Sequence, residues 1–600
     1  MKRVFTNLST GIREVRSPWL WLLLSSLGWL LPNAVMTNST LAAEKIYISY
    51  GAFESSISVA SLEAYAKTGV LDEDLANYAK YVSPQQLKQL QRVLSTQIPL
   101  SLVAVSQFLY SPIGETLLER LGEIVQTEAR QPGFYALRAA LILAATEKEG
   151  LTLLNVLEKF PTRSLRIDLG RSLQLADRLD TLIHQSRAAI ALVSKQSTTA
   201  AQGSRIDFSK LPDLRSLGHF RWHKQTLKLT DSRRKRTFFA DLYLPQQTST
   251  LAEGAQGAEY RKTNYQLPIQ NPKSKIQNSF SPRFPVIVIS HGLGSDRTSF
   301  TYLAQQLASY GFAVAVPEHP ESSAEQLRSL FSGQAAEVAE PNEFINRPLD
   351  IKYLLDELQR MNAADLRSQL DLQQVGIVGQ SLGGYTALAL AGARLQFDQL
   401  RTNCKNREDI WNVSLLLQCR VLELPAKQYN LQDSRVKAAI AINPITSSVF
   451  GQAGISRISV PVTIVASGAD TIAPALLEQI IPFSWLTTPR KYLAAIERAT
   501  HFSTIGETPP DREATLALPS QAIGPNPAIA RRYISALSVA FFETYLAKNP
   551  QYRPYLSSAY FEAISQKPLE ISLVQSLAIA QLTDAICVGT SLKTSLCPPR

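Results

Sequence analysis

Cysteine and histidine are scarce in this chain of 600 residues, which contains four cysteines and six histidines. Because no two cysteines have the Cys-x-x-Cys spacing of structural zinc sites, we expect no zinc site. Lysine and arginine outnumber aspartate and glutamate by 61 to 50, a net charge of +11, but the basic residues do not cluster with aromatic ones. This pattern argues against a nucleic-acid partner.

Long apolar runs are also missing after residue 43, where no stretch approaches the ~18 consecutive apolar residues of a membrane span. We therefore expect the body of the protein to be soluble or peripheral to a membrane. A composition of 45% hydrophobic and 18% charged residues excludes a disordered or fibrous chain. The length is that of several domains of ~150 residues.

The first 43 residues have the pattern of a targeting segment. An apolar run at residues 19–31 follows four basic side chains and precedes Leu41-Ala42-Ala43, which supplies small residues at a cleavage site. This order is typical of a secretory signal peptide, residues 1–43, cleaved before Glu44; an uncleaved anchor is the alternative. Either way we expect an exported protein, periplasmic or secreted, for which peripheral membrane association stays open.

Export determines how the cysteines are interpreted. Cys404 and Cys419 are 15 residues apart, and Cys587 and Cys597 are 10 apart. In an oxidising compartment two local disulfides are the simplest of the three pairings that four cysteines allow.

The chain divides into regions of different pattern. Residues 44–200 are predicted to form an all-helical domain, with a capping box at Ser83-Pro84-Gln85-Gln86 and a long amphipathic helix over Ile167 to Val193. Residues 201–548 form the predicted catalytic domain, which a polar segment without periodicity, residues 245–283, interrupts as a flexible insertion. Residues 549–600 are set apart as a C-terminal extension.

Apolar, β-branched runs alternate with helical segments after about residue 200. A strand that is apolar on both faces is typical of a mostly parallel sheet with helices on each side, so the fold class is α/β. The predicted strands are Phe239 to Leu244, Phe284 to Ile289, Phe312 to Val316, Val375 to Val378, Val436 to Ile442, Val460 to Ala466 and Tyr492 to Ile496.

A Gly-x-Ser-x-Gly motif at residues 379–383 connects a predicted strand to a predicted helix. A turn this tight requires small residues at Gly379 and Gly383, and it exposes the Ser381 hydroxyl at the end of the sheet. Ser381 is therefore the predicted nucleophile. The alternative is a glycine turn capped by a serine.

A serine nucleophile needs a histidine base and a carboxylate that orients the base, and this chemistry requires neither a metal nor another cofactor. In its strand–turn–helix form the chain order is Ser, acid, His, and His501 is the only histidine after Ser381. Asp470 follows a buried strand and is the predicted acid, with Glu497 as a weaker second candidate. Asp433 precedes its strand and so lies at the wrong edge of the sheet.

Backbone N–H groups must also stabilise the oxyanion that forms during ester cleavage. We expect one from Leu382, which follows the nucleophile, and one from Leu293 in the His-Gly loop that follows residues 286–289. His291 is then loop scaffolding. His319 either lines the mouth of the pocket or is a structural loop histidine.

Together these motifs resemble those of the α/β-hydrolase superfamily, and the fuller set resembles its branch of platelet-activating-factor acetylhydrolases and dienelactone-hydrolase-like proteins. The resemblance spans about Trp222 to Leu546, and it implies carboxylic ester hydrolysis, often of lipid acyl esters. Acetylhydrolases of this branch take their acid from the strand before Asp470, where this chain has Asn443. The region from Ala64 to Leu169 resembles an uncharacterised domain that precedes such hydrolases in bacteria. The motifs that carry the resemblance are residues 241–245, 291–292, 307–312, 318–319 and 379–384.

These expectations define an exported serine carboxylic ester hydrolase with a small-molecule or lipid ester substrate, such as a phospholipid of the platelet-activating-factor type. The alternatives are a catalytically idle scaffold that binds an envelope lipid or protein, and a thioesterase or peptidase with the same triad. The long amphipathic helix motivates a further hypothesis, that the N-terminal region covers the active site or contacts the membrane. Neither the role of that region nor the oligomeric state follows from the sequence.

Overall fold

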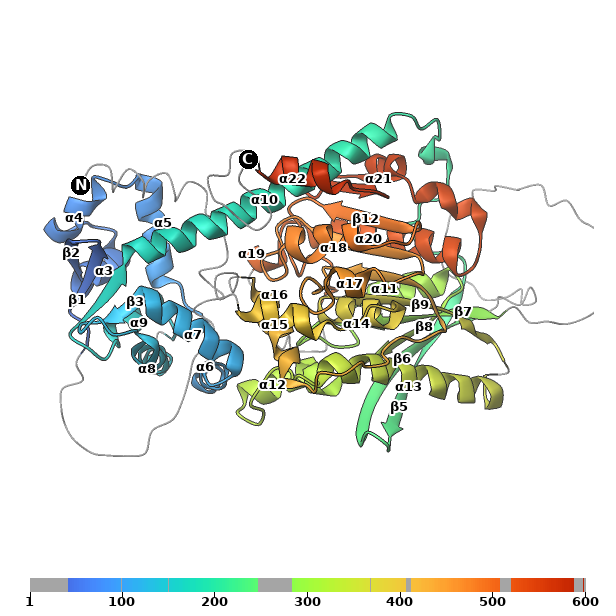
Figure 1. Ribbon diagram of the computed structural model, residues 1–600, viewed down its shortest axis with the longest axis horizontal. Helices are drawn as coiled ribbons and strands as arrows, with labels where there is room; N and C mark the ends of the chain where they lie inside the picture. Colours follow the sequence, from blue (N-terminus) through green and yellow to red (C-terminus); the bar gives the residue numbers. More distant parts are fainter. Residues whose placement is uncertain are drawn as a thin grey trace, which may run out of the picture.

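The computed structural model describes residues 42–98, 100–148, 150–246, 283–366, 368–405, 412–507, 520–587 and 597. The chain forms a small N-terminal unit with its own sheet and a larger body with a second sheet, and the long helix α10 (Leu169–Ala201) runs from the first onto the second (Figure 1). Nearly all of the predicted signal peptide and insertion, residues 1–41 and 247–282, lies outside the described residues.

The larger body is built on a nine-stranded sheet of order β13-β12-β11-β10-β9-β7-β8-β6-β5. The six central strands, β7 to β12, are parallel to one another. The strands β5, β6 and β13 pair antiparallel at the two edges. This mostly parallel sheet confirms the predicted α/β fold class. The bounds are β5 Arg221–Asp231, β6 Arg236–Gln246, β7 Phe284–Ser290, β8 Ala313–Pro317, β9 Leu370–Gln380, β10 Val436–Ile442, β11 Val462–Ser467, β12 Lys491–Ile496 and β13 Ile571–Val574.

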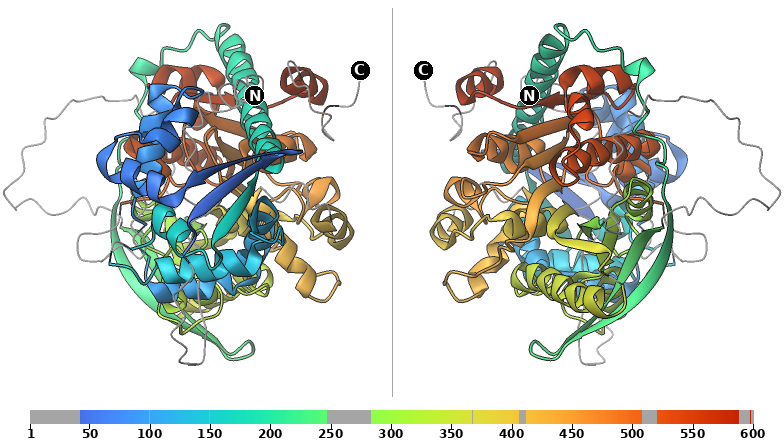
Figure 2. Two further views of the ribbon diagram at one scale, coloured as in Figure 1. Left: turned by 90° about the vertical axis from the view of Figure 1, so that its left-hand side faces the viewer. Right: turned by 90° about the vertical axis from the view of Figure 1, so that its right-hand side faces the viewer.

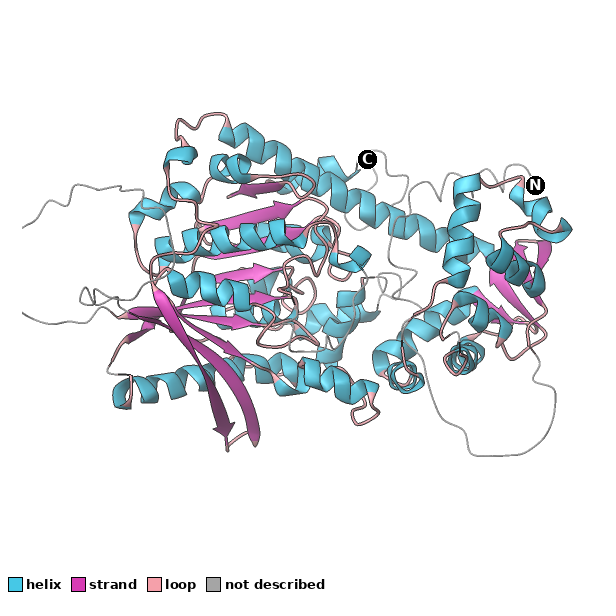
Figure 3. Cartoon of the chain, turned by 180° about the vertical axis from the view of Figure 1, so that it is seen from behind, coloured by secondary structure: helices cyan, strands magenta, loops and turns pink. Residues whose placement is uncertain are grey.

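Helices cover both faces of this sheet (Figure 3). In β7, Val286 and Val288 belong to one core cluster, with residues of α10, α13 and α14, whereas Ile287 and Ile289 belong to the other, with α11, α20 and α21. Alternate side chains are thus buried on opposite faces, which is why the strand sequence is apolar throughout. The helices are α11 Thr301–Ser309, α12 Ala324–Phe331, α13 Glu343–Ala364, α14 Leu382–Ala391, α15 Phe397–Lys405, α16 Val413–Cys419, α17 Gly451–Ile455, α18 Ile481–Trp485, α19 Ser520–Ile523, α20 Pro527–Tyr545, α21 Ser558–Ile564 and α22 Ile579–Cys587.

The N-terminal unit is not all-helical, so that prediction is wrong. It contains a four-stranded sheet of order β2-β1-β4-β3, seen in front of the larger body in the left view of Figure 2. In β1, Ile46 is buried and Ile48 packs against the same core, and this alternation is a strand signal. The strands are β1 Lys45–Tyr50, β2 Phe53–Ser58, β3 Val125–Thr127 and β4 Ser164–Asp168, and the helices are α3 Val59–Thr68, α4 Glu73–Ala79, α5 Pro84–Ser95, α6 Leu102–Leu109, α7 Pro112–Ile124, α8 Phe134–Ala144 and α9 Leu153–Glu158.

The predicted helix signals in this unit are confirmed. Ser83 and Gln86 form the capping box at the start of α5: the Gln86 N–H donates to the Ser83 hydroxyl at 3.3 Å, and the Ser83 N–H donates to the Gln86 side chain at 2.7 Å. The long predicted helix is α10, of 33 residues.

Both ends of the larger body extend past their predicted boundaries. The second half of α10 contributes Ala189, Ile190 and Val193 to the core of the larger body, so residue 200 does not divide the two units. At the other end, β13 pairs with β12 in the main sheet. The described residues 549–587 are therefore part of the larger body and not a separate extension.

Two disulfides join Cys404 to Cys419 and Cys587 to Cys597, which confirms the local pairing. The first links α15 to α16. Cys597 is buried against the core that also contains α10, so the second attaches the C-terminal segment to that core. None of the described helices has the length and apolar character needed to cross a membrane.

Candidate active site

Ser381 lies between β9 and α14 with a backbone φ of 57°, a value that side-chain-bearing residues rarely adopt. The neighbouring glycines make this turn possible. A Cβ on Gly379 would lie 1.9 Å from the Gly383 carbonyl oxygen, and a Cβ on Gly383 would lie 2.0 Å from the Ser290 carbonyl oxygen. No side chain fits at either position, so the backbones of β7, β9 and α14 are in direct contact at this turn.

Asp470 and His501 form a hydrogen-bonded pair. The distance between His501 Nδ1 and Asp470 Oδ2 is 2.7 Å, and the exposed fractions of the two residues are 4% and 7%. Asp470 Oδ1 accepts hydrogen bonds from the backbone N–H groups of Ile472 and Ala473, at 2.9 and 2.8 Å. The carboxylate is thereby fixed in orientation, and its bond to Nδ1 leaves His501 Nε2 free of the proton.

The backbone of His501 is held beside the serine turn. Gln380, which immediately precedes Ser381, donates from its side chain to the His501 carbonyl oxygen at 3.1 Å, and Asn443 donates to the same oxygen at 3.3 Å. Ser381, Asp470 and His501 follow β9, β11 and β12, which are parallel, so all three lie at the carboxyl edge of the sheet.

Two other carboxylates weighed from the sequence are not in this group. Asp433 lies before β10, at the opposite edge of the sheet, where hydrogen bonds from Arg435 outweigh the effect of burial and lower its pKa. Glu497 directly follows β12, and its backbone N–H donates to Glu570 on the segment that leads into β13. Of the candidate acids, Asp470 is the one that contacts His501.

The predicted oxyanion donors belong to two segments that meet at Ser381, the start of α14 and the loop after β7. Leu382 is the first residue of α14, where a helix leaves its backbone N–H without an internal partner. Leu293 follows Gly292, and a Cβ on Gly292 would lie 3.5 Å from the Ser381 Cβ. The loop after β7 therefore passes directly beside Ser381.

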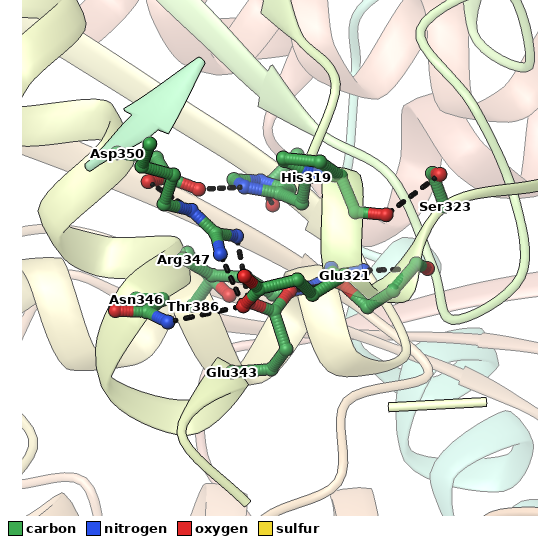
Figure 4. A network of polar contacts seen from close by, with 12 residues as sticks. His319, Glu321, Ser323, Glu343, Asn346, Arg347, Asp350 and Thr386 are labelled. Atoms are coloured by element: carbon green, nitrogen blue, oxygen red, sulfur yellow. Dashed lines mark hydrogen bonds and ion pairs between the residues drawn. The ribbon is translucent and has the colours of Figure 1, made fainter. Parts of the chain in front are cut away.

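A buried polar network lies behind this loop, and no motif in the sequence indicates its extent. His319 is fully buried, and its ring lies 3.0 Å from the Ser290 hydroxyl. On its other side it lies 3.0 Å from the Asp350 carboxylate (Figure 4). His319 is therefore a structural loop histidine, the second of the two alternatives. Burial, together with the neighbouring arginines, lowers its pKa well below the usual value, so the ring is neutral.

His291 is also fully buried, and burial lowers its pKa as well. Its Nε2 accepts from the His319 backbone N–H at 3.0 Å, which places the proton on Nδ1, 2.7 Å from the Gly292 carbonyl oxygen. The prediction that His291 is scaffolding agrees with this geometry. In the described part of the chain, His, Cys, Asp and Glu side chains form no group of three or more that could hold a metal ion.

The order of the serine, aspartate and histidine along the chain identifies the fold class of the protein. A serine after β9, an aspartate after β11 and a histidine after β12 of a mostly parallel sheet follow one another in the order of the α/β-hydrolase fold. This protein has that fold, as its motifs imply.

Two regions of the sequence are similar to known protein families. Residues 42–168 match a family described as alpha/beta hydrolase of unknown function, and residues 246–352 match the family of platelet-activating factor acetylhydrolase, isoform II. The second match includes the loop after β7 and ends before Ser381. These two matches confirm the resemblance to α/β-hydrolases and platelet-activating factor acetylhydrolases that the motifs indicate.

The curated relatives are platelet-activating factor acetylhydrolases at low identity. The protein of Canis lupus familiaris is 29% identical over 168 residues, which are 22% of this chain and 36% of the relative. The protein of Bos taurus is 27% identical over 164 residues, or 22% and 35% of the two chains. The match therefore spans about a third of the length of these relatives.

Proposed function

We propose that this protein is a serine carboxylic ester hydrolase in which Ser381 is the nucleophile, His501 the general base and Asp470 the residue that orients the base. The observation that carries the proposal is the 2.7 Å bond between His501 and Asp470 beside a serine in a strained strand-to-helix turn. A conformation of that kind is costly and persists where the surroundings impose it, which is typical of functional sites.

In the proposed acylation, His501 Nε2 takes the Ser381 hydroxyl proton while the oxygen attacks the ester carbonyl carbon. The carbonyl π electrons move to oxygen, and the N–H groups of Leu293 and Leu382 stabilise that charge. When the tetrahedral intermediate collapses, the alcohol leaves with the proton from His501 and the acyl group stays on Ser381.

Deacylation repeats these steps with water. His501 removes a proton from the water molecule, the hydroxide attacks the acyl carbon, and Ser381 leaves with the proton as the free acid is released. The Asp470 carboxylate accepts from His501 Nδ1 and stabilises the imidazolium that forms in each half-reaction.

Labelling with a fluorophosphonate probe and turnover of p-nitrophenyl esters test the proposal. Wild type should be labelled and active, and Ser381→Ala should be neither. Ser538→Ala is the matched control, because Ser538 is a fully buried serine on α20 in the same body. Undiminished turnover by Ser381→Ala would refute the proposal, and a wild type that is neither labelled nor active would favour the idle scaffold.

We propose lipid acyl esters as the substrate class, because the named relatives are platelet-activating factor acetylhydrolases. A panel of p-nitrophenyl esters of increasing acyl length, run beside phospholipids, thioesters and peptides, tests this choice. Faster turnover of a thioester or peptide than of any oxygen ester would identify the alternative leaving group.

We also propose that the protein acts outside the cytosol, at an anionic envelope surface. Its two disulfides support an oxidising compartment. Removal of residues 1–43, which carry four basic and one acidic side chain, lowers the net charge from +11 to +8, and this remaining charge supports weak attraction to anionic lipid. Cell fractionation and sedimentation with anionic phospholipid vesicles test the two parts separately, and recovery in the cytosol would refute the first.

A further inference from the structure

The loop that leaves β7 is held from behind by one arginine. Arg347, on α13, is fully buried. It donates to the His291 carbonyl oxygen at 2.6 Å and to the Gly292 carbonyl oxygen at 3.4 Å. Burial lowers the pKa of Arg347 to about 10, so the guanidinium remains charged at neutral pH. A buried cation therefore binds two successive carbonyl groups of this loop.

These contacts fix the direction of a backbone N–H. The Gly292 carbonyl oxygen is held toward Arg347 and the His291 ring. In a planar trans peptide the C=O and N–H groups point in opposite directions, so the Leu293 N–H points away from Arg347. Ser381 lies against Gly292, with its Cβ 3.5 Å from the position of a Gly292 Cβ.

We propose that Arg347 is a positioning residue for the oxyanion hole, which holds the 292–293 peptide so that the Leu293 N–H faces the carbonyl oxygen of the reacting ester. This inference rests on the proposed function. A rotated peptide would present the Gly292 carbonyl oxygen to the developing negative charge in place of an N–H donor, and that arrangement would destabilise the transition state.

The surrounding network holds Arg347 in turn. Its Nε donates to the Ser322 hydroxyl at 2.9 Å, and Glu343 Oε2 lies 3.6 Å from the same nitrogen. Glu343 also pairs with Arg236 at 2.6 Å (Figure 4 shows part of this network). The guanidinium therefore cannot rotate away from the loop without breaking buried contacts.

A second Ser–His–Asp array supports the same interpretation. Ser290, His319 and Asp350 are connected in the atom order of a catalytic triad, yet all three side chains are fully buried. A substrate cannot reach the Ser290 hydroxyl. The array instead holds Ser290, the last residue of β7, immediately before the loop that contains His291 and Gly292.

Kinetics of Arg347→Met test the proposal, with Arg435→Met as the matched control. Arg435 pairs with Asp433 and Asp356 and donates to a backbone carbonyl oxygen, but it lies at the opposite edge of the sheet. Rates are expressed per Ser381 site titrated with a fluorophosphonate. Arg347→Met should lower kcat for p-nitrophenyl acetate about 10²-fold with KM nearly unchanged, as expected for loss of one oxyanion donor.

A trifluoromethyl ketone, which forms a tetrahedral adduct with a serine, supplies a readout that a merely structural role would not change. Its affinity should fall in Arg347→Met by about the same factor as kcat, because both report on the oxyanion. Arg347→Lys, which retains a donor for one carbonyl, should recover part of both. Arg435→Met should change neither, whatever its effect on thermal stability.

Equal effects of Arg347→Met and Arg435→Met on kcat and on ketone affinity would overturn the positioning role while leaving the proposed function intact. A wild type without turnover that depends on Ser381 would overturn both. Where Arg347→Met does not fold, Arg347→Met/Glu343→Gln removes one buried charge of each sign, while Arg236 keeps Asp350 as its partner at 2.9 Å. This double variant is compared with Glu343→Gln alone. Equal kcat in those two variants would likewise overturn the inference.

Discussion

Substitution of Asp470 by asparagine removes a charge from the candidate site while preserving its shape. The oxygen of the introduced amide can still accept from the N–H groups of Ile472 and Ala473, so the loop should keep its fold. The amide nitrogen, however, would face His501 Nδ1, which in the native protein lies 2.7 Å from a carboxylate oxygen. His501 would then carry its proton on Nε2, where it cannot accept one from Ser381.

Two terms determine the expected loss. A carboxylate ~4 Å from the centre of the imidazolium charge stabilises that charge by about 4 kcal/mol at an effective dielectric constant of ~20. That energy corresponds to a factor of roughly 10³ in rate, and the wrong tautomer raises the loss toward ~10⁴. We therefore expect kcat of Asp470→Asn to be lower by about 10³ to 10⁴.

Steady-state turnover of p-nitrophenyl acetate measures this loss, and circular dichroism and thermal unfolding verify the fold. Asp433→Asn is the matched control, since Asp433 is also a buried aspartate that accepts backbone and arginine hydrogen bonds, but at the other edge of the sheet. Retention of more than about a tenth of kcat by a folded Asp470→Asn would refute the assignment of the acid.

Three further variants test the turn at Ser381 and the stability of the larger body. Gly383→Ala places a Cβ 2.0 Å from a backbone oxygen of β7 and should abolish turnover and lower the melting temperature, whereas Gly203→Ala, with no atom within 4 Å, should do neither. Burial raises the pKa of Glu543 to about 7, above its usual 4.5, so ionisation of this carboxyl group destabilises the fold as the pH rises from 4.5 through 7. Glu543→Gln should therefore raise the free energy of unfolding by about 3 kcal/mol at pH 8 and hardly at pH 4. Equal gains at both pH values would contradict the reasoning. The double variant Cys404→Ala/Cys419→Ala opens a loop of 15 residues and should lower the free energy of unfolding by about 3 kcal/mol in denaturant titrations, and no change would show that the link is dispensable.

The strands that carry the site are predictable because their signals are local. β7, β10 and β12 contain apolar runs of six, five and five residues, because helices cover both faces of the sheet. These runs are visible in the sequence without knowledge of the partner strands. The turn at Ser381 is predictable for a similar reason: contacts below 3 Å around Gly379 and Gly383 require glycine at fixed spacing.

The strands of the N-terminal unit depend on distant partners. β1 pairs with β4, where Ile46 faces Leu165, and most residues of both strands are only half-buried. A short, half-exposed strand has a weak pattern of its own, and helix caps such as the one at Ser83 dominate the local signal. β13 is fully buried, but its run of four residues is too short to be recognised without its pairing to β12.

The network around Arg347 shows a second limit. Glu343 and Arg347 are one helical turn apart, a spacing that in sequence is typical of a solvent-exposed salt bridge. Both are fully buried, because α13 packs with this face against the loop after β7. Burial of a charged face follows from the position of the helix in the fold, which the spacing of charges does not encode.

The position of the acid distinguishes this site from that of the acetylhydrolases it resembles, in which the acid follows the preceding strand. Asn443 follows β10 and Asp470 follows the adjacent β11, so both lie at the edge of the sheet beside His501. Asn443 donates to the His501 carbonyl oxygen, while Asp470 accepts at His501 Nδ1. An asparagine can make the first contact but cannot stabilise an imidazolium, and a carboxylate after β10 would face a carbonyl oxygen and be repelled by it. The two strand ends thus divide the tasks of holding the histidine backbone and orienting its ring, and the proposed mechanism requires a charge only at the second.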